Sequence, residues 1–268
     1  MIVDTICYKK VKKEEFVKKF FLIFAAGFII PAAVHASSYH FEVFLAYNQT
    51  AMTDYNKNIA DLNNMYTMYG INAQFQKLDH ALLTEVSWVA DLNSLNSGDW
   101  GFYLRAGRLN LIDDKSRINW EGVTAYETIS SDYSVDYTCA GMRKYFGFLY
   151  AGADCGAYFN WGNNSDDTLY LSSDGINYDK YEYKTTWNTF LIGFNLEAGI
   201  DYWLTDSFGI AARAGYRIVK GKVTVDLGPA YNDQMVDENV DYSGIYIGAG
   251  VMIALQQERK KSGPVSGW

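Results

Sequence analysis

Polar and apolar residues alternate along most of this chain, in runs that are joined alternately by long polar stretches and by short turns. Strict alternation with a period of two is typical of a β-strand with one apolar and one polar face. The pattern predicts eight strands, at residues 39–48, 80–92, 100–111, 132–144, 148–160, 186–204, 208–220 and 242–255.

The connections between these strands alternate in length. Long ones fall at 49–79, 112–131, 161–185 and 221–241, and short ones lie near 93–99, 145–147 and 205–207. An up-and-down barrel that spans an outer membrane has short periplasmic turns and longer extracellular loops. The sequence therefore predicts an all-β protein, an eight-stranded transmembrane β-barrel in the outer membrane of a diderm bacterium. Helical spacing of apolar residues near 59–69 also predicts a short helix in the first long connection.

The two faces of each strand follow from the same period. In the strand at 186–204, Phe194 and its apolar companions oppose Glu197 and Asp201. Aromatic residues gather toward the ends of the apolar face, as at membrane interfaces: Tyr181, Tyr183, Trp187, Tyr202, Trp203 and Phe208. A soluble barrel of the lipocalin type would bury its apolar face instead and leave the charges outside. The aromatic residues and the charged opposite face favour the membrane barrel, with its apolar face toward lipid.

The charged residues of the inward face form a candidate lumen network. Its members are Glu42, Glu85, Arg105, Glu197, Asp201, Arg213 and Arg217, and Asp91, Asp136 and Asp154 are expected on the same face. With a turn centred near Asp206, Glu197 and Asp201 reach Arg213 and Arg217 diagonally across one hairpin. Side chains fill an eight-stranded barrel, so we expect a structural plug, and a mild effect of Gly193→Ser in the lumen. The alternative is a narrow pore that passes cations or protons.

The amino terminus has the pattern of a secretory signal peptide. Lys18 and Lys19 precede an apolar run at 20–30, and small residues at 33–36 provide a cleavage site. We expect residues 1–36 to be removed, 37–255 to form the barrel and 256–268 to form a polar tail. The leader holds six lysines and three acidic residues, so 17 of 23 basic and 28 of 31 acidic residues remain, a formal charge of −11. An acidic chain of this kind lacks the basic face that nucleic acid binding requires.

The last strand, from Ser243 to Leu255, has the form of the signal that outer-membrane barrels present to the barrel-assembly machinery. With this strand, the chain resembles the small eight-stranded outer-membrane barrels, a group that includes the transmembrane domain of outer membrane protein A and the opacity-type surface proteins. The resemblance covers about residues 39–255 and rests on architecture; a polar tail follows where the group has a terminal Phe. It implies contact with outer-membrane lipid and lipopolysaccharide.

Two cysteines remain after the leader. Cys139 and Cys155 are equidistant from Gly147, at the turn between two strands. With an odd number of turn residues the two sulfurs would share a face, and the oxidising exterior would permit a disulfide. The alternative is two small apolar residues that face lipid.

Signals for catalysis and for cofactors are weak. The remaining alternative is a lipid-modifying enzyme of the outer membrane, which needs a histidine with Ser or Asp partners at the rim. His80 with Asp79 and Ser172 or Ser173 is the only such combination, and we expect a hydrogen-bonded rim histidine instead. No cofactor motif occurs, and the scattered acids of 161–185 make a weak calcium site at most. We predict no catalysis and a structural or adhesion-like surface role, in which long aromatic and acidic loops contact an extracellular ligand.

Overall fold

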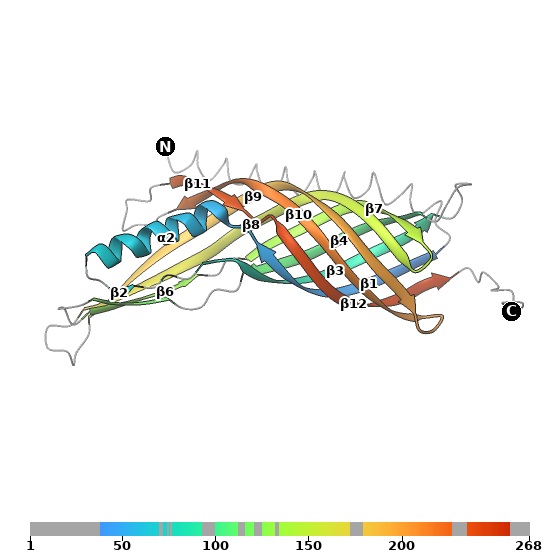
Figure 1. Ribbon diagram of the computed structural model, residues 1–268, viewed down its shortest axis with the longest axis horizontal. Helices are drawn as coiled ribbons and strands as arrows, with labels where there is room; N and C mark the ends of the chain where they lie inside the picture. The colour runs from blue at the N-terminus through green and yellow to red at the C-terminus, as the bar shows by residue number, and fades with distance from the viewer. Residues whose placement is uncertain are drawn as a thin grey trace, which may run out of the picture.

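A closed ring of eight antiparallel strands forms the body of the protein (Figure 1). The computed structural model describes residues 38–69, 72–73, 75, 77–92, 100–111, 116–120, 125–131, 134–171, 179–226 and 235–257. The predicted signal peptide at 1–36, and most of the predicted tail at 256–268, lie outside these residues. In ring order the strands are β1 (Ser38–Thr50), β3 (His80–Leu92), β4 (Trp100–Leu111), β7 (Ser134–Phe146), β8 (Leu149–Leu171), β9 (Asp179–Trp203), β10 (Phe208–Asp226) and β12 (Gly244–Gln257). Pairing of β12 with β1 closes the ring, and the predicted barrel is confirmed.

The long connections contain more regular structure than the sequence predicts. β8 and β9 run for 23 and 25 residues and stay paired as far as Leu171 and Asp179. The short strands β2 (Asn72–Ala73), β5 (Ser116–Trp120), β6 (Ala125–Ser131) and β11 (Met235–Asp241) extend this sheet beyond the ring. Only about 9 to 11 residues of a tilted strand cross a membrane. Beyond that length no lipid demands an apolar outer face, so polar residues occupy outward positions and the strand signal becomes weaker.

The helix α2 (Thr53–Met68) occupies the first long connection and agrees with the predicted helical spacing. It lies beside the extended strands at the long-loop end of the barrel, whereas the short turns lie at the opposite end (Figure 1). In the part of the chain that the structure describes, no helix is both long enough and apolar enough to cross a membrane.

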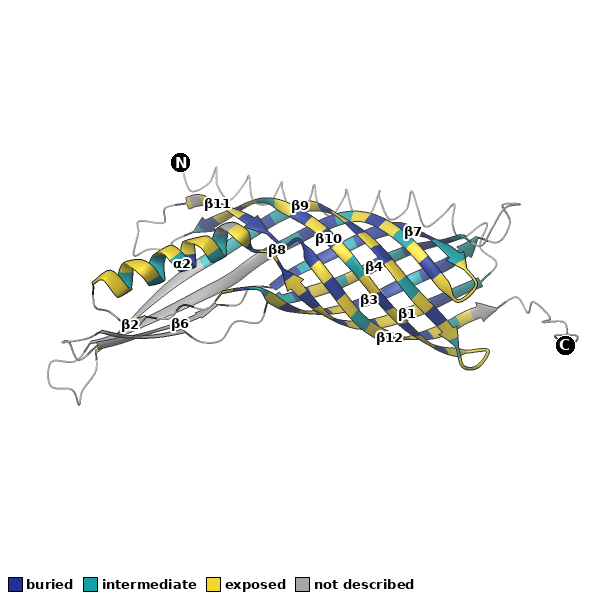
Figure 2. Cartoon of the chain, viewed as in Figure 1, coloured by how far each residue is buried: buried dark blue, intermediate teal, exposed yellow. Residues whose placement is uncertain are grey.

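Exposed and buried residues alternate around the whole ring (Figure 2). The exposed positions at 190–202 of β9 and 208–218 of β10 are apolar, for example Phe194, Leu196 and Ile210, whereas Glu197 and Arg213 point inward and are buried. A broad apolar outer surface around a charged interior is stable in lipid and not in water. The protein is therefore an outer-membrane β-barrel of a diderm bacterium, and its long-loop end is the extracellular end.

The aromatic residues of the outer face are distributed differently from the prediction. Tyr202 and Phe208 are exposed on the outer face, near the short turns. Trp187 instead packs on the buried core, and Trp203 lies edge-on to buried His40, because both tryptophans occupy inward positions of β9. Tyr181 is exposed on the far extension of β9. At the periplasmic end Trp88 stacks on Tyr39 at 5.6 Å, and this pair forms part of the interface aromatics.

Candidate functional site

The centre of the lumen holds a compact network of arginines and carboxylates. Arg105 Nη2 lies 2.6 Å from Asp154 Oδ2 and 2.8 Å from Glu197 Oε2, and Arg213 is ion-paired with Glu85. All five side chains are buried. Charges in such a place are stable only when they are paired and hydrogen-bonded. The network links β3, β4, β8, β9 and β10 across the barrel.

Tyrosine hydroxyls supply further donors to these carboxylates. Tyr137 donates to Glu85 at 2.6 Å, Tyr103 to Asp154 at 2.9 Å, and Tyr246 to Glu197 at 3.0 Å. The lumen therefore contains hydrogen-bonded aromatic rings as well as ion pairs. These rings occupy space that a conducting pore would need for water.

The predicted partner is present for Glu197 and wrong for Asp201. The register itself agrees with the sequence, since Arg213 lies opposite Gly199 and Arg217 opposite Asn195. Glu197 Oε2 reaches Arg213 Nη1 at 3.7 Å as predicted, although it lies closer to Arg105 Nη2, at 2.8 Å. Asp201 instead pairs with Arg143 Nη1, at 3.3 Å. Arg143 belongs to β7, so it reaches Asp201 across the lumen rather than along a hairpin. The same guanidinium contacts Glu42 at 2.5 Å.

Arg217 has an aromatic environment instead of a carboxylate. Its guanidinium carbon lies 5.2 Å from the ring centre of Tyr137 and 5.5 Å from those of Tyr158 and Tyr246. Its Nε donates to Asn195 Oδ1 at 3.2 Å. Cation–π contacts of this kind stabilise a desolvated guanidinium. Within the described residues, no ion pair to a carboxylate involves Arg217.

Sequence reasoning missed Arg143 and misplaced Asp136. The period of two puts Arg143 on the same face as Tyr137 and Cys139, so the signal for an inward arginine was present. Asp136 has the opposite parity and faces outward, where Arg108 Nε donates to its Oδ1 at 2.6 Å. The pair lies on the half-exposed outer surface and not in the lumen network.

An apolar layer lies in the lumen on its extracellular side. Its members are buried side chains from five strands of the barrel wall, from the segments next to α2 and from the segment between β11 and β12: Met52, Leu78, Leu83, Leu109, Val135, Leu191, Val219, Val223 and Tyr242. Leu109, Val135 and Val219 are completely buried. Close-packed aliphatic side chains leave little space between them, so this layer and the charged network fill successive levels of the lumen.

The helix α2 is held firmly at the extracellular end. The Asn63 amide accepts a hydrogen bond from the Phe75 backbone N–H at 2.9 Å and donates to the Phe75 carbonyl at 3.0 Å. Asn56 makes the same two bonds with Leu78, at 2.8 and 3.2 Å. At its start, Met52 N–H donates to the Asp241 carbonyl at 2.9 Å. Side-chain amides seven residues apart thus attach one helix face to the returning chain.

Asp241 also connects β11 to β10 beyond the membrane. Its carboxylate accepts hydrogen bonds from Lys220 Nζ at 2.8 Å and from the Ser243 backbone N–H at 3.0 Å. Partial burial acts to raise the pKa of the Asp241 carboxyl, but these hydrogen bonds outweigh burial and hold the pKa below its usual range. The carboxylate is therefore ionised at neutral pH.

The structure does not join Cys139 to Cys155. The turn at Gly147 and Phe148 pairs Phe146 with Leu149, so it has an even number of residues. Cys139 then lies opposite Gly156 and is buried in the lumen, whereas Cys155 is exposed toward lipid. The two sulfurs are on opposite faces of the sheet, which excludes a disulfide between them.

Both histidines of the described chain have hydrogen-bonding or ionic partners. His80 Nε2 lies 3.1 Å from Asp79 Oδ1, and its Nδ1 is hydrogen-bonded to the Tyr47 hydroxyl. Ser172 and Ser173, the suggested nucleophiles, lie outside the described residues. His40 is buried, with Nε2 at 3.3 Å from Glu42 Oε1.

Three potential metal ligands lie close together on the periplasmic side of the lumen. Ligand atoms of His40, Glu42 and Asp201 lie within 4.8 Å of one another. The Arg143 guanidinium contacts both carboxylates, however, and places a fixed positive charge where a cation would bind. This arrangement favours a buried ion pair rather than a metal centre.

Some of the residues that were predicted to contact a ligand from the long loops lie outside the residues that the structure describes. Tyr178 and Tyr231 are outside the described residues, as are Asp174 and Gly175. The backbone at 163–167 belongs to β8, and that at Trp120, Tyr126 and Tyr170 belongs to β5, β6 and β8. These residues therefore lie on strands rather than on irregular loops.

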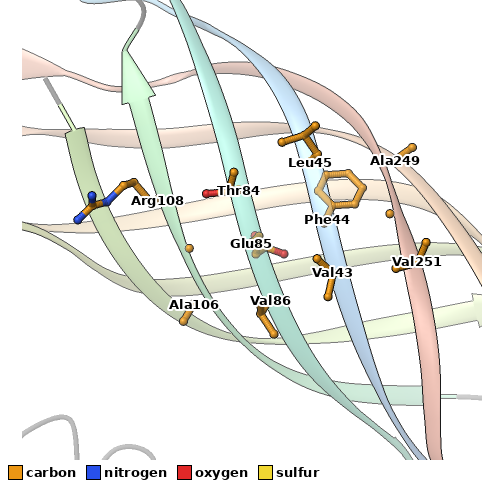
Figure 3. Close-up of a pocket in the computed structure, with 12 residues that line it drawn as sticks. Val43, Phe44, Leu45, Thr84, Glu85, Val86, Ala106, Arg108, Ala249 and Val251 are labelled. Carbon is orange, nitrogen blue, oxygen red and sulfur yellow. The ribbon is translucent and has the colours of Figure 1, made fainter. Parts of the chain in front are cut away.

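The outer wall carries an apolar groove of about 570 Å³ across β12, β1, β3 and β4 (Figure 3). Thr84, Ala106 and Ala249 provide its small side chains, and bulkier residues border them: Val43, Leu45, Val86 and Val251. Arg108 also lines the groove, close to the extracellular end of β4. A concave strip in a lipid-facing wall is shaped to accept a chain from the surrounding bilayer.

Solved structures with a similar fold are all barrels of very different sequence. Neisserial surface protein A matches over 81% of this chain and 97% of its own, with 13% identity and a TM-score of 0.39. The outer membrane protein OprG from Pseudomonas aeruginosa matches over 83% and 98%, with 12% identity and a TM-score of 0.42. Ail, the attachment invasion locus protein of Yersinia pestis, matches over 81% and 99%, with 12% identity and a TM-score of 0.37. No family profile matches the chain, and no curated protein matches it in sequence.

Proposed function

We propose that this protein is a closed outer-membrane barrel that acts at the cell surface by contacting an extracellular partner, without conducting ions and without catalysis. The observation that carries the proposal is the filling of the lumen by two successive layers of side chains. Arg105, Arg143 and Arg213 fill its lower part with ion pairs, and the apolar layer fills its upper part. In a barrel closed in this way, the polar side chains that a partner can reach lie outside the lumen.

The extracellular end has the features of a recognition surface. Strands β8, β9 and β10 continue beyond the membrane and, with α2, form a structured projection. Three large side chains are exposed at the end of α2 and on the residue that follows it, since Met65, Met68 and Tyr69 are 44%, 86% and 76% exposed. Exposed apolar clusters on a rigid support mark interaction sites.

Conductance measurements test the closed lumen. Refolded protein in a planar bilayer should give no stepwise current at low voltage. A steady current from the parent protein would instead support the alternative of a narrow cation-passing pore.

Binding measurements test the surface role. Protein in liposomes is applied to an array of glycans and extracellular proteins, beside a Met68→Ser, Tyr69→Ser double variant. The matched control is Lys57→Ser, Asn64→Ser, which changes exposed polar residues of the same helix. We expect at least one probe to bind the parent and the control variant but not the double variant. Identical binding profiles for all three proteins would overturn the role of the helix tip.

A further inference from the structure

We propose that the groove across β12, β1, β3 and β4 is a binding site for lipid A, the phosphorylated lipid of the outer leaflet. One acyl chain lies in the groove, and Arg108 contacts a phosphate of the head group. The site lies on the outer wall, so it is independent of the lumen and of the proposed recognition surface.

The shape and lining of the groove suit an acyl chain. Ala106 and Ala249 leave a depression between Leu45, Val86 and Val251, which project from the wall and are 54%, 50% and 37% exposed (Figure 3). An aliphatic chain in this depression gains contacts on two sides, whereas a convex wall offers contacts on one. The groove therefore selects a hydrocarbon chain by packing.

The position of Arg108 identifies the end where the head group lies. Arg108 is close to the extracellular end of β4, and its partner Asp136 is close to the extracellular start of β7. Their side chains are 53% and 40% exposed on the outer wall. Charges that face hydrocarbon are costly, so this pair belongs at the level of the lipid head groups.

The pair also fixes the orientation of the guanidinium. Arg108 Nε and Nη2 donate to the two Asp136 oxygens at 2.6 and 3.0 Å, which fixes the plane of the guanidinium. Arginine recognises phosphate through the same planar geometry. The Asp136 carboxylate opposes an approaching phosphate, so the two residues have opposite effects on its binding.

The opposite effects of Arg108 and Asp136 on phosphate binding can be measured directly. Binding of lipid A that carries both phosphates is measured by native mass spectrometry of the refolded protein, beside the same lipid A after dephosphorylation. We expect Arg108→Gln to weaken binding of the phosphorylated lipid by about 10-fold, as for loss of one charge-assisted hydrogen bond, and Asp136→Asn to strengthen it. Neither variant should change binding of the dephosphorylated lipid.

A merely structural ion pair predicts a different result. Breaking it from either side would then shift lipid binding in the same direction, and that outcome would overturn the assignment of Arg108. Equal binding of the two lipids by the parent would show that phosphate is not recognised, and would overturn it as well.

The groove itself is tested by filling it. Ala106→Leu should weaken binding of both lipids, whereas Ala153→Leu, the same change at an exposed position of β8 outside the groove, should leave both unchanged. Equal binding by Ala106→Leu and the parent would overturn the acyl-chain site. Mobility of unboiled protein on a gel confirms that each variant is folded.

Discussion

At the residue scale, the lumen is specified by close fits between inward tyrosines and glycines of the neighbouring strands. A Cβ atom on Gly215 would lie 2.5 Å from the Tyr246 ring, and one on Gly193 would lie 2.6 Å from the Tyr158 ring. Real Cβ atoms do not approach so closely, so both positions need glycine. The rings held there contact Arg217 and donate hydrogen bonds to the buried polar groups.

This fit reverses the expectation for Gly193→Ser. The added side chain would displace Tyr158, and overpacking of a filled interior costs about 1–3 kcal/mol. Ala198→Ser, at an exposed lipid-facing position of the same strand, is the control. Urea unfolding of both variants in lipid vesicles should show the larger loss for Gly193→Ser. Equal losses would mean that the lumen tolerates the new side chain.

Removal of Arg213 tests the charged network. Arg213→Ala leaves buried Glu85 without its closest cation, although Arg105 remains 3.4 Å away. Breaking a buried ion pair from one side costs about 3–5 kcal/mol. We expect a corresponding loss of unfolding free energy, while Lys222→Ala at an exposed position stays near the parent. An Arg213→Ala protein as stable as the parent would contradict the structural role of the network.

At the scale of single elements, each strand changes character along its length. In β10, outward positions are apolar as far as Ile218 and then become Lys220 and Lys222, while inward positions stay buried. The change from apolar to polar outward residues marks the edge of the lipid. The helix α2 lies outside the lipid and is attached by hydrogen bonds from asparagines on one face, while Met68 stays exposed.

A charge on the lipid-facing wall tests the orientation of β9. Phe194 is 55% exposed at an outward position, so Phe194→Arg places a guanidinium in hydrocarbon. We expect a loss of about 2–4 kcal/mol in vesicle unfolding if the site is near the middle of the bilayer. Phe194→Leu, which keeps the position apolar, should cost much less. An equal cost for both would mean that the residue does not face lipid.

The attachment of α2 is tested through Asn63. Asn63→Ala removes both hydrogen bonds to Phe75, and each bond contributes about 0.5–1.5 kcal/mol. Hydrogen exchange at the Phe75 amide should become faster, and α2 should be cleaved more readily by protease. Asn64→Ala, at the exposed neighbouring position, is the matched control. No difference between these variants would show that the Asn63 hydrogen bonds do not hold the helix.

At the scale of the whole molecule, ring closure leaves no unpaired strand edge in the membrane. Each barrel strand is paired on both sides, from β1 with β12 and β3 around to β10 with β9 and β12. Every backbone polar group in the wall then has a partner inside the protein, as hydrocarbon requires. Opening the ring requires the loss of a complete ladder of bonds at once.

This cooperativity predicts resistance to detergent. Unboiled protein in sodium dodecyl sulfate should migrate faster on a gel than boiled protein, because the closed barrel stays compact. Boiling should abolish the difference. Equal mobility of the two samples would count against a closed membrane barrel.

The sequence by itself determined the barrel, its eight strands and the face of most residues, because contact with lipid on one side imposes a strict period of two. Local turn geometry also followed for the hairpin that brings Arg213 opposite Gly199. The same period located Glu42, Glu85, Arg105 and Glu197 in the lumen, since a charge has no stable place on the lipid side.

Only the tertiary structure decided which inward residues meet. Arg143 reaches Glu42 and Asp201 across the barrel, and Arg217 lies among tyrosines, because closure of the ring places strands distant in sequence face to face. The parity of a two-residue turn separated Cys139 from Cys155. Beyond the membrane the outward positions need not be apolar, since water tolerates polar residues there, and the strand signal becomes weaker. The pairing of the strands therefore decided how far they extend.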